Sequence, residues 1–131
     1  MARIGLLLYW VLVVYASCYP WTGWRTTGLA PWSYLFEALP HYWTTFDLIT
    51  NIAAYVPLGA LIVFALYPRI TGTPAVCWAV ASGVLLAVAL ECIQSYLPSR
   101  VPSILDLITN ASGVLIGAML GQWLSGPILK R

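Results

Sequence analysis

Hydrophobic residues gather in four long runs along the chain, at residues 4–19, 46–66, 74–96 and 104–124. Proline, glycine and polar residues are concentrated between these runs. A helix needs about 20 apolar residues to cross a bilayer. The last three runs have 21 to 23 residues and the first has 16, and we expect each to form a membrane-spanning helix. Tyr15 fits poorly with the small-residue pattern before a signal-peptide cleavage site, so we expect the first helix to be retained. The pattern predicts an all-α membrane protein, a four-helix transmembrane bundle forming a single domain over residues 1–131.

The segment at residues 20–45 differs from the other connections in its aromatic content. It holds six tryptophan and tyrosine residues: Trp21, Trp24, Trp32, Tyr34, Tyr42 and Trp43. Such side chains favour the interface between bilayer and water. We expect an aromatic interfacial loop between helices 1 and 2 that lies flat on the membrane, with a short helix at residues 32–39. Its simplest role is that of an anchor without chemistry.

The same pentapeptide, Asp-Leu-Ile-Thr-Asn, begins the second and the fourth run, at residues 47–51 and 106–110. Residues at i and i+4 share one helical face, so each copy directs two polar side chains the same way near a helix start. Consecutive spans alternate in direction, which brings both copies to one end of the bundle. We therefore predict two helical hairpins related by a parallel repeat.

Further polar residues should lie at the same end. Glu91 and Gln94 share one face near the end of the third run, and Arg100 follows in a proline-bracketed loop. The sequence thus predicts one polar, acidic pocket, whose candidate ligand-binding residues are Asp47, Asn51, Glu91, Gln94, Arg100, Asp106 and Asn110.

Gly113, Gly117 and Gly121 form a glycine zipper on the fourth run. Small residues at this spacing let another helix approach closely. That helix could belong to the same chain, to a second copy in a homo-oligomer, or to another membrane protein.

Composition supports the membrane assignment, because 61% of the residues are hydrophobic and only 8% are charged, against about 25% charged in soluble domains. A net charge of +2 argues against a nucleic-acid partner. Cys18, Cys77 and Cys92 form no CxxC pair, which favours buried thiols over a disulfide framework or a zinc site. We expect no cofactor.

Orientation follows from the basic residues in the short loops. With both termini inside, four basic residues are cytoplasmic, namely Arg3, Arg69, Lys130 and Arg131, and two are outside, Arg25 and Arg100. Cytoplasmic loops carry the excess of lysine and arginine. We therefore expect cytoplasmic N- and C-termini and a pocket at the outer face.

Ionisable groups within a membrane are costly and by default indicate function. Three carboxylates near one arginine leave an acidic surplus that suits a general acid or base, a proton relay or a cation site. The catalytic candidates are Glu91, Asp106 and Asp47. We expect no metal, although a divalent ion held by these carboxylates is an alternative. Another is a purely structural polar cluster, in a helix-interaction protein or a transporter subunit.

The order of these motifs resembles the VanZ-like family of small bacterial integral membrane proteins. The resemblance covers roughly residues 44–122 and rests on Asp47-x3-Asn51, Pro57-Leu58-Gly59, Glu91-x2-Gln94, Arg100, Asp106-x3-Asn110 and Gly113-x3-Gly117. It implies a multi-pass protein of the bacterial inner (cell) membrane. Some members are linked to resistance to glycopeptide antibiotics such as teicoplanin.

The leading hypothesis is that the pocket binds a lipid headgroup, a cell-envelope precursor or a glycopeptide-like ligand. Arg100 would contact phosphate or carboxylate, and the side-chain amides would form hydrogen bonds with the ligand. The alternatives are a membrane-embedded enzyme that uses a carboxylate on a lipid-linked substrate and, third, a proton-coupled transporter.

Overall fold

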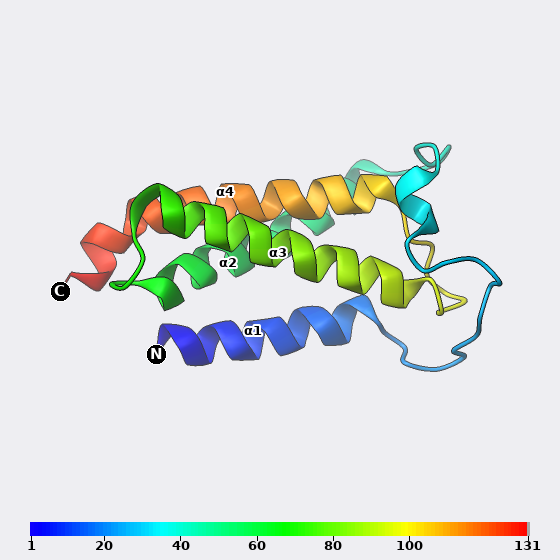
Figure 1. The fold of residues 1–131 in the computed structure, drawn as a ribbon, viewed down its shortest axis with the longest axis horizontal. Helices are drawn as coiled ribbons and strands as arrows, with labels where there is room; N and C mark the ends of the chain where they lie inside the picture. Colours follow the sequence, from blue (N-terminus) through cyan, green and yellow to red (C-terminus); the bar gives the residue numbers. More distant parts are fainter. Residues whose placement is uncertain (131) are drawn as a thin grey trace.

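The computed structural model describes residues 1–130 and is all-α, with four helices and a short 3-10 turn. In chain order these are α1 (Ala2–Ser17), η1 (Ser33–Phe36), α2 (Thr45–Leu66), α3 (Gly72–Gln94) and α4 (Ile104–Leu129). The helices alternate in direction, so α2 and α4 run the same way (Figure 1). Both chain ends lie at one end of the bundle, and the long connection between α1 and α2 lies at the other (Figure 1). The all-α fold is confirmed.

Three of the helices are long and apolar enough to cross a membrane: α2, α3 and α4, with 22, 23 and 26 residues. α1 has 16 residues and is about 24 Å long at a rise of about 1.5 Å per residue. By length, therefore, three of the four predicted spans are confirmed, and α1 falls short of the usual span of about 20 residues.

Two helices end at other residues than predicted, α1 earlier and α4 later. α1 ends at Ser17 instead of residue 19, because Pro20 disfavours the helical conformation for the residue before it. α4 continues to Leu129, five residues beyond the predicted 124. The apolar pattern marks only the part of a helix that lies in lipid, and a helix is free to continue past the interface.

The glycine zipper of α4 packs against α2 of the same chain. A Cβ on Gly117 would overlap the carbonyl of Val56, and one on Gly59 of α2 would overlap the carbonyl of Val114. The two backbones are thus in direct contact, as small residues permit. All three zipper glycines are buried. This corrects the alternative of a homo-oligomer or membrane partner at the Gly113, Gly117 and Gly121 face, because α2 already covers it.

The aromatic segment crosses the end of the bundle where α2 and α4 begin (Figure 1). Its helical part is a single turn, Ser33–Phe36, shorter than the predicted 32–39. Tyr34 is only 1% exposed, and its hydroxyl donates to the carbonyl oxygen of Val88 in α3 at 3.4 Å. Burial raises the pKa of the Tyr34 hydroxyl, which therefore stays protonated as a donor. The aromatic segment is thus attached to α3 through Tyr34. Most of its other aromatic side chains are exposed.

Candidate functional site

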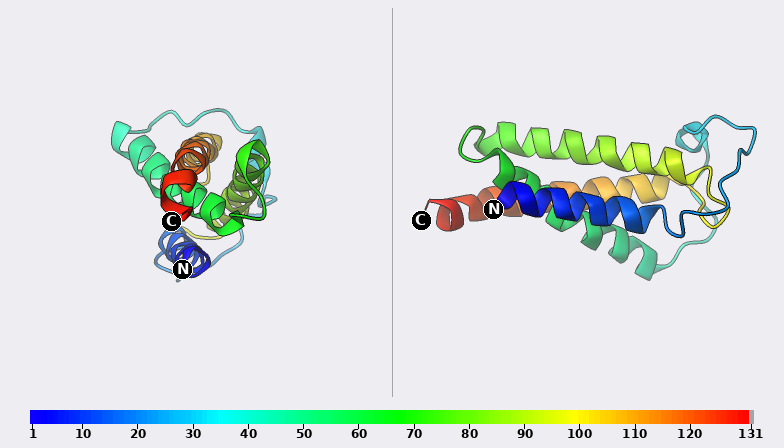
Figure 2. Two further views of the ribbon diagram at one scale, coloured as in Figure 1. Left: turned by 90° about the vertical axis from the view of Figure 1, so that its left-hand side faces the viewer. Right: turned by 90° about the horizontal axis from the view of Figure 1, so that it is seen from below.

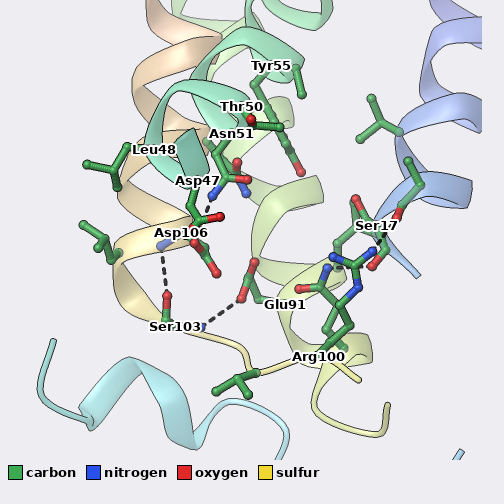
Figure 3. A pocket seen from close by; sticks show the side chains of 18 of the residues that line it. Ser17, Asp47, Leu48, Thr50, Asn51, Tyr55, Glu91, Arg100, Ser103 and Asp106 are labelled. Carbon is green, nitrogen blue, oxygen red and sulfur yellow. Dashed lines mark hydrogen bonds between the residues drawn. The ribbon is translucent and has the colours of Figure 1, made fainter. Parts of the chain in front are cut away.

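A cavity of about 920 Å³ occupies the end of the bundle where α2 and α4 begin and α1 and α3 end (Figure 3). All seven predicted binding residues line it: Asp47, Asn51, Glu91, Gln94, Arg100, Asp106 and Asn110. The aromatic segment contributes Pro40, Tyr42 and Trp43 to the lining. The structure thus brings together side chains from every helix of the bundle.

Both repeats begin with a side-chain N-cap, and the first also closes the reciprocal bond of a capping box. Thr44 Oγ1 accepts a hydrogen bond from the backbone N–H of Asp47 at 3.1 Å, and Asp47 Oδ2 accepts one from the N–H of Thr44 at 3.1 Å. Ser103 Oγ likewise accepts from the N–H of Asp106 at 3.1 Å. Sequence reasoning missed the capping roles of Thr44 and Ser103. The signal was present as Thr or Ser three residues before each repeated Asp, the spacing of a capping box.

Two hydrogen bonds between residues that line the cavity connect α4 and its N-cap to α2 and α3 (Figure 3). Asn51 Nδ2 of α2 donates to Asp106 Oδ1 of α4 at 2.9 Å. The backbone N–H of Ser103 donates to Glu91 Oε2 of α3 at 3.0 Å. Glu91 is only 4% exposed. The two bonds fix both carboxylates, Asp106 against α2 and Glu91 against the start of α4.

Gln94 and Arg100 attach the end of α1 to the rim of the cavity. Gln94 Nε2 donates to the carbonyl oxygen of Ser17 at 2.7 Å. Arg100 donates from Nη2 to the oxygen of Ala16 at 3.1 Å and from Nε to that of Tyr19 at 3.3 Å. The last carbonyls of a helix lack intrahelical donors and form the negative end of its dipole. Arg100 thus caps α1, and in the described part of the chain it bonds to none of the cavity carboxylates.

Asn110 has a buried side-chain oxygen that forms no hydrogen bond with the described residues. It is 6% exposed and lines the cavity, yet its Oδ1 atom is buried without a hydrogen-bond donor. A buried acceptor left unpaired costs about 1–3 kcal/mol, and such groups are usually satisfied by water or a ligand. Asn110 is the repeat counterpart of Asn51, which is bonded to Asp106. The repeat is therefore symmetric in sequence and asymmetric in bonding.

The donor atoms do not favour a metal centre. Over residues 1–130, no group of three or more His, Cys, Asp and Glu side chains is arranged to hold an ion. Asp47, Glu91 and Asp106 thus do not form such a group.

The prediction of buried thiols is confirmed for Cys18 only. Cys92 is half-buried, and Cys77 lies exposed on α3.

Residues 4–125 match the VanZ/LLP1 family. The chain belongs to this family. The match extends beyond residues 44–122, on which the resemblance rested, to α1 and the aromatic segment. Together with three helices long enough to cross a bilayer, it identifies this VanZ/LLP1 protein as a multi-pass membrane protein. No curated protein and no solved structure matches the chain.

Proposed function

We propose that this VanZ/LLP1 protein binds a polar ligand, a lipid headgroup or a cell-envelope precursor, in the cavity at the outer face of the bacterial inner membrane. The observation that carries the proposal is the buried, unpaired Oδ1 of Asn110 in the cavity wall. A purely structural cluster accounts for Asn51, Asp106 and Glu91 through their interhelical bonds. It does not account for Asn110, because an apolar side chain at that position would avoid the cost of the unpaired oxygen.

The distribution of charge supports the orientation. Arg3 in α1, Arg69 between α2 and α3, and Lys130 after α4 lie at the end of the bundle that carries the chain termini (Figure 1). Two basic residues, Arg25 and Arg100, lie toward the cavity end. Excess basic residues favour the cytoplasmic side. On this basis the termini are cytoplasmic and the cavity faces outward, where capture of an envelope precursor would also fit a role in glycopeptide resistance.

Native mass spectrometry of gently extracted protein tests the proposal. The wild type should carry a non-protein mass that Asn110→Leu loses. Ser112→Leu is the matched control, because Ser112 lies on the same helix, donates only to the Ile108 carbonyl of its own helix, and does not line the cavity. This control should retain the mass. The proposal fails if the wild type carries nothing, or if Asn110→Leu carries the same mass in the same amount.

A further inference from the structure

α1 and α2 are in contact along only part of their length. Arg3 Nε donates to the Ala65 carbonyl at 3.3 Å, and the Tyr9 hydroxyl donates to the Ala54 carbonyl at 2.6 Å. Beyond Tyr9 the helices diverge toward the cavity end (Figure 2). Leu12 of α1 and Thr50 of α2 line the cavity there and are exposed. The cavity thus reaches the surface between α1 and α2 at Leu12 and Thr50, and we call this stretch the side opening. The Tyr9–Ala54 bond joins the two helices next to it.

The side opening is bordered by apolar, exposed side chains. Leu12 on α1 is 56% exposed and Phe46 on α2 is 76% exposed, and both line the cavity. In a multi-pass membrane protein such surfaces face lipid. The aromatic segment, through Tyr42 and Trp43, covers part of the cavity at the end of the bundle. The side opening is thus a route by which an acyl chain could remain in the bilayer while its headgroup occupies the cavity.

The cavity wall offers one buried hydrogen-bond acceptor that lacks a donor. This acceptor is Asn110 Oδ1, for which the described residues supply no hydrogen bond. An amide oxygen only accepts hydrogen bonds. The complementary ligand group is therefore a donor, either an ammonium or a hydroxyl group. Arg100 uses Nε and Nη2 on α1, which leaves Nη1 for a phosphate at the rim.

We infer that the ligand is a membrane amphiphile with a hydrogen-bond-donating headgroup, and that it reaches the cavity from the bilayer through the side opening between α1 and α2. This inference rests on the proposed function, because it names the ligand class of the same cavity. It goes further in fixing which group of the ligand meets Asn110 and by which path the ligand arrives.

Nanodiscs with equal amounts of phosphatidylethanolamine, phosphatidylglycerol and phosphatidylcholine, all with the same acyl chains, test the headgroup. The first two lipids carry ammonium or hydroxyl donors, and the choline headgroup carries none. Native mass spectrometry should show that ethanolamine or glycerol lipid is retained about tenfold over choline lipid, the effect of one good hydrogen bond to a charged or buried acceptor. Asn110→Leu should lower the retention of ethanolamine and glycerol lipid to that of choline lipid.

Two further arms test the path. Leu12→Trp should narrow the side opening and reduce lipid retention, whereas Leu8→Trp, also exposed on α1 at 66% but outside the cavity lining, should not. Soluble phosphoethanolamine at the same concentration should fail to displace bound lipid, because it gains nothing from the apolar border.

The outcomes separate the two proposals. In one contrary outcome the wild type retains choline lipid as strongly as the other two lipids, and Asn110→Leu loses all three. This result would overturn the donor requirement and leave the proposed function standing. Displacement by soluble phosphoethanolamine, or a Leu12→Trp protein that binds as the wild type does, would overturn access from the bilayer. If no lipid and no soluble compound binds in any arm, both proposals fail.

Discussion

Asn51 and Asn110 occupy the same position of the two repeats, yet their replacement by leucine should change stability in opposite directions. Asn51 donates to Asp106 at 2.9 Å. Asn51→Leu removes this bond and leaves a half-buried carboxylate with one partner fewer, at a cost of about 1–2 kcal/mol. Asn110→Leu instead removes a buried oxygen that has no partner. The leucine side chain is of similar size, so this variant should be as stable as the wild type or more stable by about 1 kcal/mol.

The measurement is reversible unfolding in mixed micelles, on protein first stripped of lipid, for the wild type and both variants. Stripping matters because a bound ligand stabilises the folded state by mass action. Adding ligand back should therefore stabilise the wild type and Asn51→Leu more than Asn110→Leu. If stripped Asn110→Leu is less stable than the wild type by as much as Asn51→Leu, then Asn110 is bonded within the protein and the argument from its unpaired oxygen is refuted.

Three further predictions concern packing, the end of α1 and orientation. Gly117→Ala should destabilise the fold by about 1–3 kcal/mol in the same unfolding assay, because the added methyl group overlaps the backbone of α2. Arg100→Ala should speed hydrogen exchange at the end of α1, since the Ala16 carbonyl in its last turn and the Tyr19 carbonyl just beyond it each lose a donor; this is read out by mass spectrometry. In a variant without Cys18, Cys77 and Cys92, Ser99→Cys at the cavity lining should react in intact cells with an impermeant maleimide. Lys130→Cys in the same background should not react.

Each of these has a control or a contrary outcome. Gly126 has nothing within 4 Å of a built Cβ, so Gly126→Ala should leave stability unchanged or raise it slightly. Equal loss in both glycine variants would contradict the packing argument. Unchanged exchange in Arg100→Ala would show that Gln94 alone holds α1. Labelling at Lys130 but not at Ser99 would place the cavity on the cytoplasmic side.

The residues that line the cavity could be predicted from the sequence, because their placement depends only on helix periodicity and helix direction. The i, i+4 spacing of Asp47 and Asn51, and of Asp106 and Asn110, fixes their faces, and alternating spans bring both repeats to one end. Individual bonds could not be predicted, because identical repeat residues acquire different neighbours. Glu91 lies beside the start of α4 and takes a backbone N–H there, which leaves the two asparagines in different surroundings.

Other features depend on chain paths that periodicity does not encode. The bonds of Arg100 to the carbonyls of Ala16 and Tyr19 could not be predicted, because they join residues more than 80 positions apart in the chain. The glycine spacing is the same whether the facing helix is in the same chain or another, so only the three-dimensional arrangement identifies α2 as its partner. The side opening likewise depends on how far α1 and α2 diverge (Figure 2).

The most direct test of the central claim is an experimental density map of the protein in phosphatidylethanolamine nanodiscs. We predict headgroup density in the cavity, with its nitrogen at a hydrogen-bonding distance of about 2.7–3.2 Å from Asn110 Oδ1, and acyl density leaving between α1 and α2. The claim is contradicted if a protein donor is bonded to Asn110 Oδ1, or if the cavity holds no headgroup and lipid lies only on the outer surface of the helices.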